Sequence, residues 1–261
     1  MTATRLRVLL CDADDNLFPS EAPAFAASCE VTNEFMRAIG SDRRFEPEGL
    51  RMAAAGKNFR ATAEGLARDF GVAVDPELLD RFAEEERRQV TAHLAAVLQP
   101  DPLVTESLTR LNRQFELAAV SSSATPRLAA CFRATGLDAL FPPALRFSAY
   151  DSLPAPSSKP DPAVYLLAGE RLGVGPEQAV AIEDSLSGVQ SAVAAGFPTI
   201  GNVAFVEEGE RAARIETLRS AGARAVVRSW SELEDRLSVS ALGAGEPDAT
   251  CGEHARVPAS R

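Results

Sequence analysis

The fold is decided by the stretch Val8–Leu17, which reads VLLCDADDNL. Its first four residues are apolar without a break, as is typical of a strand buried on both faces of a parallel sheet. Three carboxylates follow within four positions, just past the end of that strand. Ligands of open parallel α/β sheets bind at this edge. Carboxylates this close raise each other's pKa unless a cation neutralises them, so the stretch predicts a bound metal.

The second half of the chain predicts the rest of the sheet. From residue 102 onward, helical patterns alternate with short apolar strands, which indicates βαβ units and helices on both faces of a parallel sheet. The further strands are expected at Phe115–Val120, Leu145–Phe147, Ala179–Ile182, Pro198–Ile200 and Ala225–Val227. The helices between and after them are expected at Leu103–Asn112, Pro126–Thr135, Pro162–Leu172, Ser187–Ala195 and Ser231–Leu237. The predicted fold class is therefore α/β, with a Rossmann-like core.

An all-helical segment separates the first strand from this alternation. Helical patterns run from Ser20 to Ile39 and then over Pro47–Ala55, Arg60–Phe70 and Asp75–Leu98, with no strand pattern. We therefore expect an inserted helical domain at residues 19–100 and a core domain at 1–18 and 101–238. Residues 239–261 are rich in Ala, Gly, Ser and Pro, which predicts a disordered tail.

Composition limits the classes of function. The chain has 261 residues, of which 46% are hydrophobic, and a formal net charge of −10. That charge argues against nucleic-acid and membrane partners, which select basic surfaces. No apolar run reaches membrane-spanning length, and no signal-peptide core precedes the first strand. The four scattered cysteines, Cys11 among them, suit a reducing cytoplasm, and we expect a cytoplasmic protein.

Lysine is rare in a chain rich in basic residues. Of the 27 basic residues only Lys57 and Lys159 are lysines, and the others are arginines. Such a bias suggests that a compact ammonium is needed at these two positions, where a flat guanidinium does not serve. Chance retention of two surface lysines is the alternative, and it is weaker for Lys159.

Polar residues follow three more of the expected strands or open the helix after them. Val120–Ser123 ends an apolar strand in three serines, a pattern that could also simply cap the next helix. Ser158–Pro162 reads SKPDP and leads into a helix. Ala181–Val189 reads AIEDSLSGV, with two acids directly after a strand.

In this order, the four segments resemble the motifs of the haloacid dehalogenase (HAD) superfamily, most of whose members are Mg²⁺-dependent phosphohydrolases. Residues 12–17 are similar to its first motif, Asp-x-Asp-Gly-Thr-Leu or Asp-x-Asp-Asp-Thr-Leu. The segment EDSLSG at residues 183–188 is similar to its fourth motif, Glu-Asp-Ser-x-x-Gly. This sequence departs from the family pattern at Asp15, Asn16 and Ala163, where Gly, Thr and Asp are usual.

The resemblance implies a role for each catalytic residue. Asp12 would attack phosphorus and form an aspartyl-phosphate, and Asp14 would protonate the leaving oxygen and then activate water. The Ser121 hydroxyl and the Ser122 amide would bind the phosphoryl group. Lys159 would pair with the nucleophile and the phosphate.

The resemblance also implies the metal site. Asp184 would bind the metal, and Glu183 would support it directly or through water. The Asp12 carboxylate and the Asp14 backbone carbonyl would complete the protein ligands. All of these donors are oxygens, so Mg²⁺ is expected over Zn²⁺.

The helical insert resembles the C1 cap of the same superfamily, which closes over the site and reads the leaving group. We hypothesise that Lys57, assisted by Arg60, contacts the substrate beyond its phosphate; an exposed turn between helices is the alternative.

The leading interpretation is a phosphatase acting on a small phosphorylated metabolite, such as a sugar phosphate or phosphoglycolate, in the branch of β-phosphoglucomutase and phosphoglycolate phosphatase. A phosphomutase is an alternative, although the mutase's Lys-Asn pair is replaced by Ala124-Thr125. Phosphonoacetaldehyde hydrolase-like C–P cleavage through an imine on Lys57 is disfavoured by Asp14. A non-catalytic binding protein with this fold is compatible with Asn16 and Ala163. The oligomeric state is left open, and a monomer is compatible with the sequence.

Overall fold

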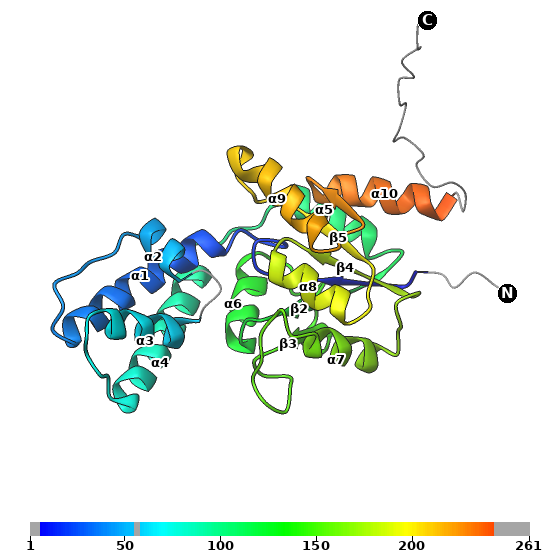
Figure 1. Ribbon diagram of the computed structural model, residues 1–261. Coiled ribbons are helices and arrows are strands. Elements are labelled where there is room, and N and C mark those ends of the chain that lie inside the picture. The colour runs from blue at the N-terminus through cyan, green and yellow to red at the C-terminus, as the bar shows by residue number, and fades with distance from the viewer. Residues whose placement is uncertain (1–5, 55–57, 243–261) are drawn as a thin grey trace, which may run out of the picture.

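The computed structural model describes residues 6–54 and 58–242, and these form a six-stranded parallel sheet. Neighbouring strands follow the order β3-β2-β1-β4-β5-β6 (Figure 1). The strands are β1 (Val8–Cys11), β2 (Glu116–Ser121), β3 (Arg146–Ser148), β4 (Ala179–Glu183), β5 (Thr199–Asn202) and β6 (Ala225–Val227). The chain order reverses between β1 and β4, which is where ligands bind in such sheets. The predicted α/β class is confirmed.

Helices cover both faces of the sheet because the side chains of its central strand alternate between two cores. Leu9 and Cys11 belong to one core, and Val8 and Leu10 belong to the other. The first core includes side chains of α5 (Pro102–Leu111), α6 (Thr125–Ala134) and α10 (Trp230–Leu242). The second includes side chains of α7 (Ala163–Leu172) and α8 (Leu186–Ala194). The unbroken apolar run of β1 is therefore needed to fill both cores.

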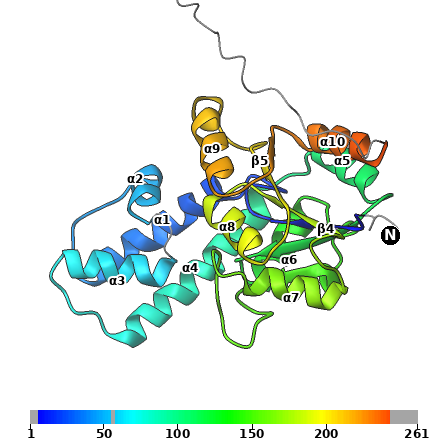
Figure 2. The ribbon, with the colours of Figure 1, turned by 45° about the vertical axis from the view of Figure 1, so that its right-hand side comes forward.

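Four helices follow β1 before the chain returns to the sheet. They are α1 (Glu21–Ala38), α2 (Pro47–Ala53), α3 (Phe59–Asp69) and α4 (Pro76–Val97). They share an apolar cluster of their own, which includes Phe35, Met36 and Leu50. Figures 1 and 2 show them gathered beside the sheet, and α4 also packs against α6. Their order along the chain is the one expected for the helical insert.

One helix was not expected from the sequence. Helix α9 (Glu208–Ser220) lies between β5 and β6, and Leu218 is its one residue classed as buried. A helix that buries so little gives a weak apolar periodicity, so the sequence pattern does not reveal it. Helix α10 extends to Leu242, which corrects the expected start of the tail at residue 239; residues 243–261 lie outside the described part.

Within the described ranges, no helix has the length and apolar character required to cross a membrane.

Candidate active site

The polar residues that follow separate strands meet at one cavity of about 870 Å³. Asp12 follows β1, Ser121 ends β2 and Asp184 follows β4. Strand β1 pairs directly with β2 and with β4, so these three strand ends are neighbours at one edge of the sheet. Lys159, which precedes α7, lines the same cavity. The structure therefore brings Asp12 together with residues that follow it by more than a hundred positions.

Lys159 is the centre of this arrangement. Its Nζ atom donates hydrogen bonds to Asp12 Oδ1 at 2.5 Å, Glu183 Oε1 at 2.6 Å and the Val120 carbonyl oxygen at 2.7 Å. The side chain is only 4% exposed. Its backbone N–H donates to Ser122 Oγ at 3.1 Å. An ammonium has three donors in a compact group, and all three are used here, which a planar guanidinium would not match.

Glu183 is wholly buried beneath Asp12 and Lys159. Its Oε1 atom also accepts a hydrogen bond from the Tyr165 hydroxyl at 2.5 Å. Its Oε2 atom is buried without a hydrogen-bond partner among the described residues. A Cβ atom on residue 188 would lie 1.8 Å from that oxygen, so Gly188 is required for space. This contact explains why glycine stands at the end of the EDSLSG segment.

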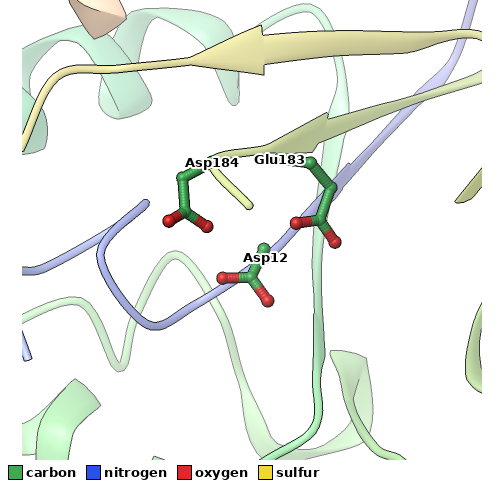
Figure 3. A group of neighbouring side chains, drawn as sticks. All are labelled: Asp12, Glu183 and Asp184. Carbon is green, nitrogen blue, oxygen red and sulfur yellow. The ribbon is translucent and has the colours of Figure 1, made fainter. Parts of the chain in front are cut away.

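Three carboxylates could hold a metal ion at this point (Figure 3). Asp12, Glu183 and Asp184 each offer an oxygen, and these oxygens all lie within 4.8 Å of one another. Burial raises the pKa of Asp12 to about 8 although Lys159 opposes the shift, and burial together with Asp12 raises the pKa of Asp184 well above its ordinary value. Such groups ionise together only beside a further positive charge. The buried all-oxygen donor set fits a hard divalent cation such as Mg²⁺.

The Asp14 carboxylate is held by three close hydrogen-bond donors. It accepts hydrogen bonds from Ser20 Oγ at 2.6 Å, Ser123 Oγ at 2.7 Å and Arg127 Nη2 at 2.9 Å. Ser121 Oγ lies 3.4 Å from it. Burial alone would raise the pKa of Asp14, but Arg127 and the two hydroxyls outweigh burial, so the pKa lies below its ordinary value.

The two departures in the first motif have structural explanations. Asp15 has a φ of 53°, a conformation that favours glycine and that Asp also tolerates, which accounts for both residue types there. Asn16 Nδ2 donates to the carbonyl oxygens of Asp12 at 2.9 Å and Ile182 at 3.2 Å, and its Oδ1 accepts from Asn202 at 2.8 Å. An asparagine thus ties the end of β1 to β4 and β5.

The departure at Ala163, in the third motif, also has a structural explanation. Asp161 Oδ1 accepts a hydrogen bond from the backbone N–H of Ala163 at 2.9 Å, at the start of α7. The Asp161 carboxylate thus satisfies the backbone N–H of the first residue of α7, which the Ala163 side chain cannot do.

The structure does not bring Arg60 to the cavity. Its guanidinium pairs with Asp80 on α4 and lies 3.4 Å from Glu64, and it is not among the residues that line the cavity. The expectation of a substrate contact from Arg60 is therefore corrected: two surface carboxylates hold its charge at the α3–α4 contact. Lys57 lies outside the described residues, although Ala54 and Asn58 on either side of it line the cavity.

Several lining residues were not identified from the sequence. The polar ones include Ser28 of α1, Arg51 of α2, Glu86 of α4, Arg127 of α6 and Arg214 of α9. None belongs to a motif, and arginine is so common in this chain that no single one stands out. These residues line the cavity because tertiary packing brings α1–α4 and α9 to the strand ends, and no local sequence pattern reveals that packing.

Comparison with known proteins agrees with this geometry. The family model of haloacid dehalogenase-like hydrolases matches residues 7–196. The chain therefore belongs to the haloacid dehalogenase-like hydrolase family, and the resemblance seen in its four motifs is confirmed.

Three relatives show which kinds of family member the chain is similar to. A phosphorylated carbohydrates phosphatase of Thermotoga maritima is 45% identical over 73 residues, which are 28% of this chain and 31% of that protein. The solved structure of a putative β-phosphoglucomutase from Thermotoga maritima is 27% identical, with a TM-score of 0.65 over 90% of this chain and 99% of that one. A HAD family hydrolase from Deinococcus radiodurans R1, solved with bound phosphate and sodium, is 25% identical, with a TM-score of 0.64 over 94% and 100% of the two chains. The chain thus matches about a third of the length of the curated relative.

Proposed function

We propose that the protein is a Mg²⁺-dependent phosphatase that hydrolyses a phosphomonoester of a small metabolite through an aspartyl-phosphate intermediate. The observation that carries this proposal is the contact of Lys159 with Asp12 beside Asp184, at the point where the strand order reverses. A buried carboxylate beside one ammonium and further carboxylates is suited to phosphoryl transfer rather than to binding alone. The relative that acts on phosphorylated carbohydrates supports a sugar phosphate or a compound of similar size.

Asp12 is the nucleophile in this proposal. Its carboxylate attacks phosphorus while Lys159 keeps it oriented and balances charge on the transferring group. The Ser121 hydroxyl and the Ser122 amide bind the phosphoryl oxygens. Asp14 delivers a proton to the leaving oxygen and then takes one from the attacking water, once the anionic phosphate beside it has raised its pKa from the low value that Arg127 and the hydroxyls set in the free protein. The hydrogen bonds that Asp14 accepts from Ser20 and Ser123 fix its carboxylate at the cavity that Asp12 also lines.

The metal would be held by the carboxylates of Asp12 and Asp184 and by the backbone carbonyl of Asp14. Glu183 would support the metal directly or through water, and its Oε1 is already shared by Lys159 and Tyr165. When bound, Mg²⁺ supplies charge neutralisation for the phosphate and for the acidic group around it.

The helices α1–α4 would act as the cap. We assign residues 19–100 to a cap domain and residues 1–18 and 101–238 to the catalytic core. The separate apolar cluster of α1–α4 and their contribution to the cavity lining support this division. The described cysteines Cys11, Cys29 and Cys131 are free thiols, which supports a cytoplasmic location.

The test is phosphate release from a panel of sugar phosphates, phosphoglycolate and nucleotides, with Mg²⁺ and with EDTA. We expect Mg²⁺-dependent release from at least one compound by the wild type and none by Asp12→Asn. Activity that persists in Asp12→Asn would refute the proposal, and so would a protein inactive on every compound.

A phosphomutase is the second candidate, because a putative β-phosphoglucomutase is among the similar structures. The local structure gives this candidate less support. The Thr125 backbone N–H donates to Asp151 at 2.5 Å and Thr125 begins α6, so Ala124 and Thr125 serve as a helix start. Conversion of β-glucose 1-phosphate to glucose 6-phosphate, measured beside phosphate release, distinguishes the two activities.

A further inference from the structure

Tyr165, in the first turn of α7, is wholly buried next to the candidate site and does not line its cavity. Its hydroxyl donates a hydrogen bond to Glu183 Oε1 at 2.5 Å. The ammonium of Lys159 lies over the face of the same ring, with Nζ 5.2 Å from the ring centroid, which is within the range of a cation–π contact. Tyr165 therefore contacts both partners of the buried ion pair between Lys159 and Glu183.

Packing in the second core holds the Tyr165 ring in place. The ring centroid lies 6.4 Å from that of Phe197. Phe197 packs so close to α7 that a Cβ atom on residue 169 would lie 2.8 Å from Phe197 Cζ. The start of α7 is tied to α8 as well, because Ser191 Oγ donates to the Asp161 carbonyl oxygen at 2.7 Å. The fold therefore sets the direction in which the Tyr165 hydroxyl points.

Glu183 and Asp12 share the ammonium of Lys159. Nζ donates to Asp12 Oδ1 at 2.5 Å and to Glu183 Oε1 at 2.6 Å, and both carboxylates are buried. Glu183 Oε2 has no hydrogen-bond partner among the described residues, so the Tyr165 hydroxyl and Lys159 both donate to Oε1. Because the hydroxyl compensates part of the charge on Oε1, it weakens the attraction of Glu183 for the ammonium. Lys159 is then more available to Asp12.

We propose that Tyr165 is a positioning residue, whose hydroxyl holds Glu183 so that Lys159 stays directed at Asp12 and at the phosphoryl group that Asp12 receives. The effect on turnover rests on the proposed phosphatase function, whereas the effect on Lys159 rests on the contacts alone. Tyr165 does not line the cavity, so it acts through Glu183 and Lys159 and not by touching the substrate. A displaced ammonium would cost stabilisation of the transition state rather than substrate binding.

The test removes the hydroxyl and keeps the ring. Tyr165→Phe retains the packing against Phe197 and the ring face beside Lys159. Tyr150→Phe is the matched control, because Tyr150 is the other of the two tyrosines in the chain, is 40% exposed and does not line the cavity. Steady-state kinetics of the full-length, Mg²⁺-loaded protein with p-nitrophenyl phosphate and with a sugar phosphate give kcat and KM. Thermal denaturation gives the stability of each variant.

A second measurement needs no substrate. Protein labelled with ¹⁵N in lysine alone gives side-chain NMR signals from two residues, because Lys57 and Lys159 are the two lysines of the chain. The signal that remains in Lys57→Arg belongs to Lys159. Its chemical shift in the wild type and in Tyr165→Phe reports whether the hydrogen bonds of the ammonium depend on the Tyr165 hydroxyl.

We expect kcat and kcat/KM of Tyr165→Phe to fall together by about 10- to 100-fold, with KM close to that of the wild type, as for an interaction that acts in the transition state. The Lys159 signal should shift in Tyr165→Phe. Tyr150→Phe should match the wild type in both measurements.

Three results would overturn the inference while leaving the proposed function intact. The first is a folded Tyr165→Phe that keeps either the wild-type kcat or the wild-type Lys159 signal. The second is a loss of activity that arises through KM. The third is a Tyr165→Phe that does not fold, since the hydroxyl would then be a structural group. A wild type inactive on every phosphoester would instead refute the proposed function, and the Lys159 signal would still decide whether Tyr165 positions the ammonium.

Discussion

Gly188 lies so close to the Glu183 carboxylate that a Cβ atom on residue 188 would be 1.8 Å from Glu183 Oε2. Glu183 has no room to retreat, because it is wholly buried and its Oε1 is held by Lys159 and Tyr165. The start of α8 and the buried carboxylate of β4 are therefore fitted to each other. Lys159, which contacts Asp12, depends on that fit.

Gly188→Ala should lower both stability and turnover. The added methyl group must displace Glu183, and overpacking of this kind costs roughly 1–3 kcal/mol in the free energy of unfolding. A displaced Glu183 also releases Lys159, so kcat should fall. Urea denaturation and phosphate-release kinetics measure the two effects. Gly209→Ala is the control, because residue 209 lies in α9 with open space around it and should gain up to about 1 kcal/mol. Equal stability and kcat in Gly188→Ala and the wild type would contradict the packing argument.

Lys159→Met should be strongly destabilising near neutral pH. It removes the ammonium shared by Asp12 and Glu183, and breaking a buried ion pair from one side costs about 3–5 kcal/mol. The loss should shrink as the pH falls, because protonated carboxyl groups no longer need a cation. Lys159→Arg keeps the charge and should retain more stability while losing turnover, since a guanidinium cannot reproduce the three short contacts. A Lys159→Met variant that melts like the wild type at pH 7.5 would show that the ammonium does not hold this site together.

Stabilisation by Mg²⁺ should increase with pH. Without metal, burial raises the pKa of Asp12 to about 8 from an ordinary value of 3.8, so the folded protein keeps a proton that the unfolded chain has released. Its contribution to stability is complete below the ordinary pKa and is lost as the pH rises toward 8. Mg²⁺ replaces that proton, so the increase in melting temperature on adding Mg²⁺ should be larger at pH 8 than at pH 5.5.

At a concentration of about 100 times its Kd, the metal should add about 2.7 kcal/mol to the free energy of unfolding. Asp184→Asn is the matched variant, because it removes the negative charge of one carboxylate and leaves the size of the side chain nearly unchanged. Its response to Mg²⁺ should be much smaller. A shift in melting temperature that is the same at both pH values, or the same in Asp184→Asn, would argue against binding at these carboxylates.

Asn16→Ala should destabilise the core by about 2–4 kcal/mol. Asn16 is wholly buried, and its truncation removes three hydrogen bonds: those to the Asp12 and Ile182 carbonyl oxygens and the one from Asn202 Nδ2. A double-mutant cycle with Asn202→Ala isolates the Asn16–Asn202 contact, and the coupling should exceed about 0.5 kcal/mol. Strictly additive effects would mean that the two amides act independently.

Much of the fold follows from local pattern in the sequence. The apolar run of β1 and the alternation after residue 102 predict the parallel sheet, because a buried strand and a βαβ unit each have a local signature. Helix α9 lacks such a signature, since Leu218 is its one residue classed as buried. Arg214, which donates to the Asp184 carbonyl, was missed along with it.

The centre of the candidate site could be predicted because its residues follow strands, where topology brings them together. Asp12 and Asp184 come directly after strands, Lys159 precedes the helix that follows β3, and the structure places all three at one cavity. Arg127 and Glu86 line that cavity from the helices α6 and α4, and their spacing along the chain does not predict that they would. Arg60 shows the converse: its position at the start of α3 suggested a role in binding, but Asp80 on α4 holds its charge.

The most direct test of the account is to trap a phosphoryl group on Asp12. The wild type and Asp14→Asn would be mixed with Mg²⁺ and a hydrolysed substrate, quenched rapidly in acid, reduced with borohydride and digested for mass spectrometry. Borohydride converts an aspartyl-phosphate into the alcohol and leaves a free aspartate unchanged. We predict that the reduced residue is found at position 12, that it is more abundant in Asp14→Asn because the intermediate then lacks its base, and that it is absent without Mg²⁺. A wild type that turns over substrate while neither protein carries a modification at Asp12, or one in which it falls on another residue, would contradict the account.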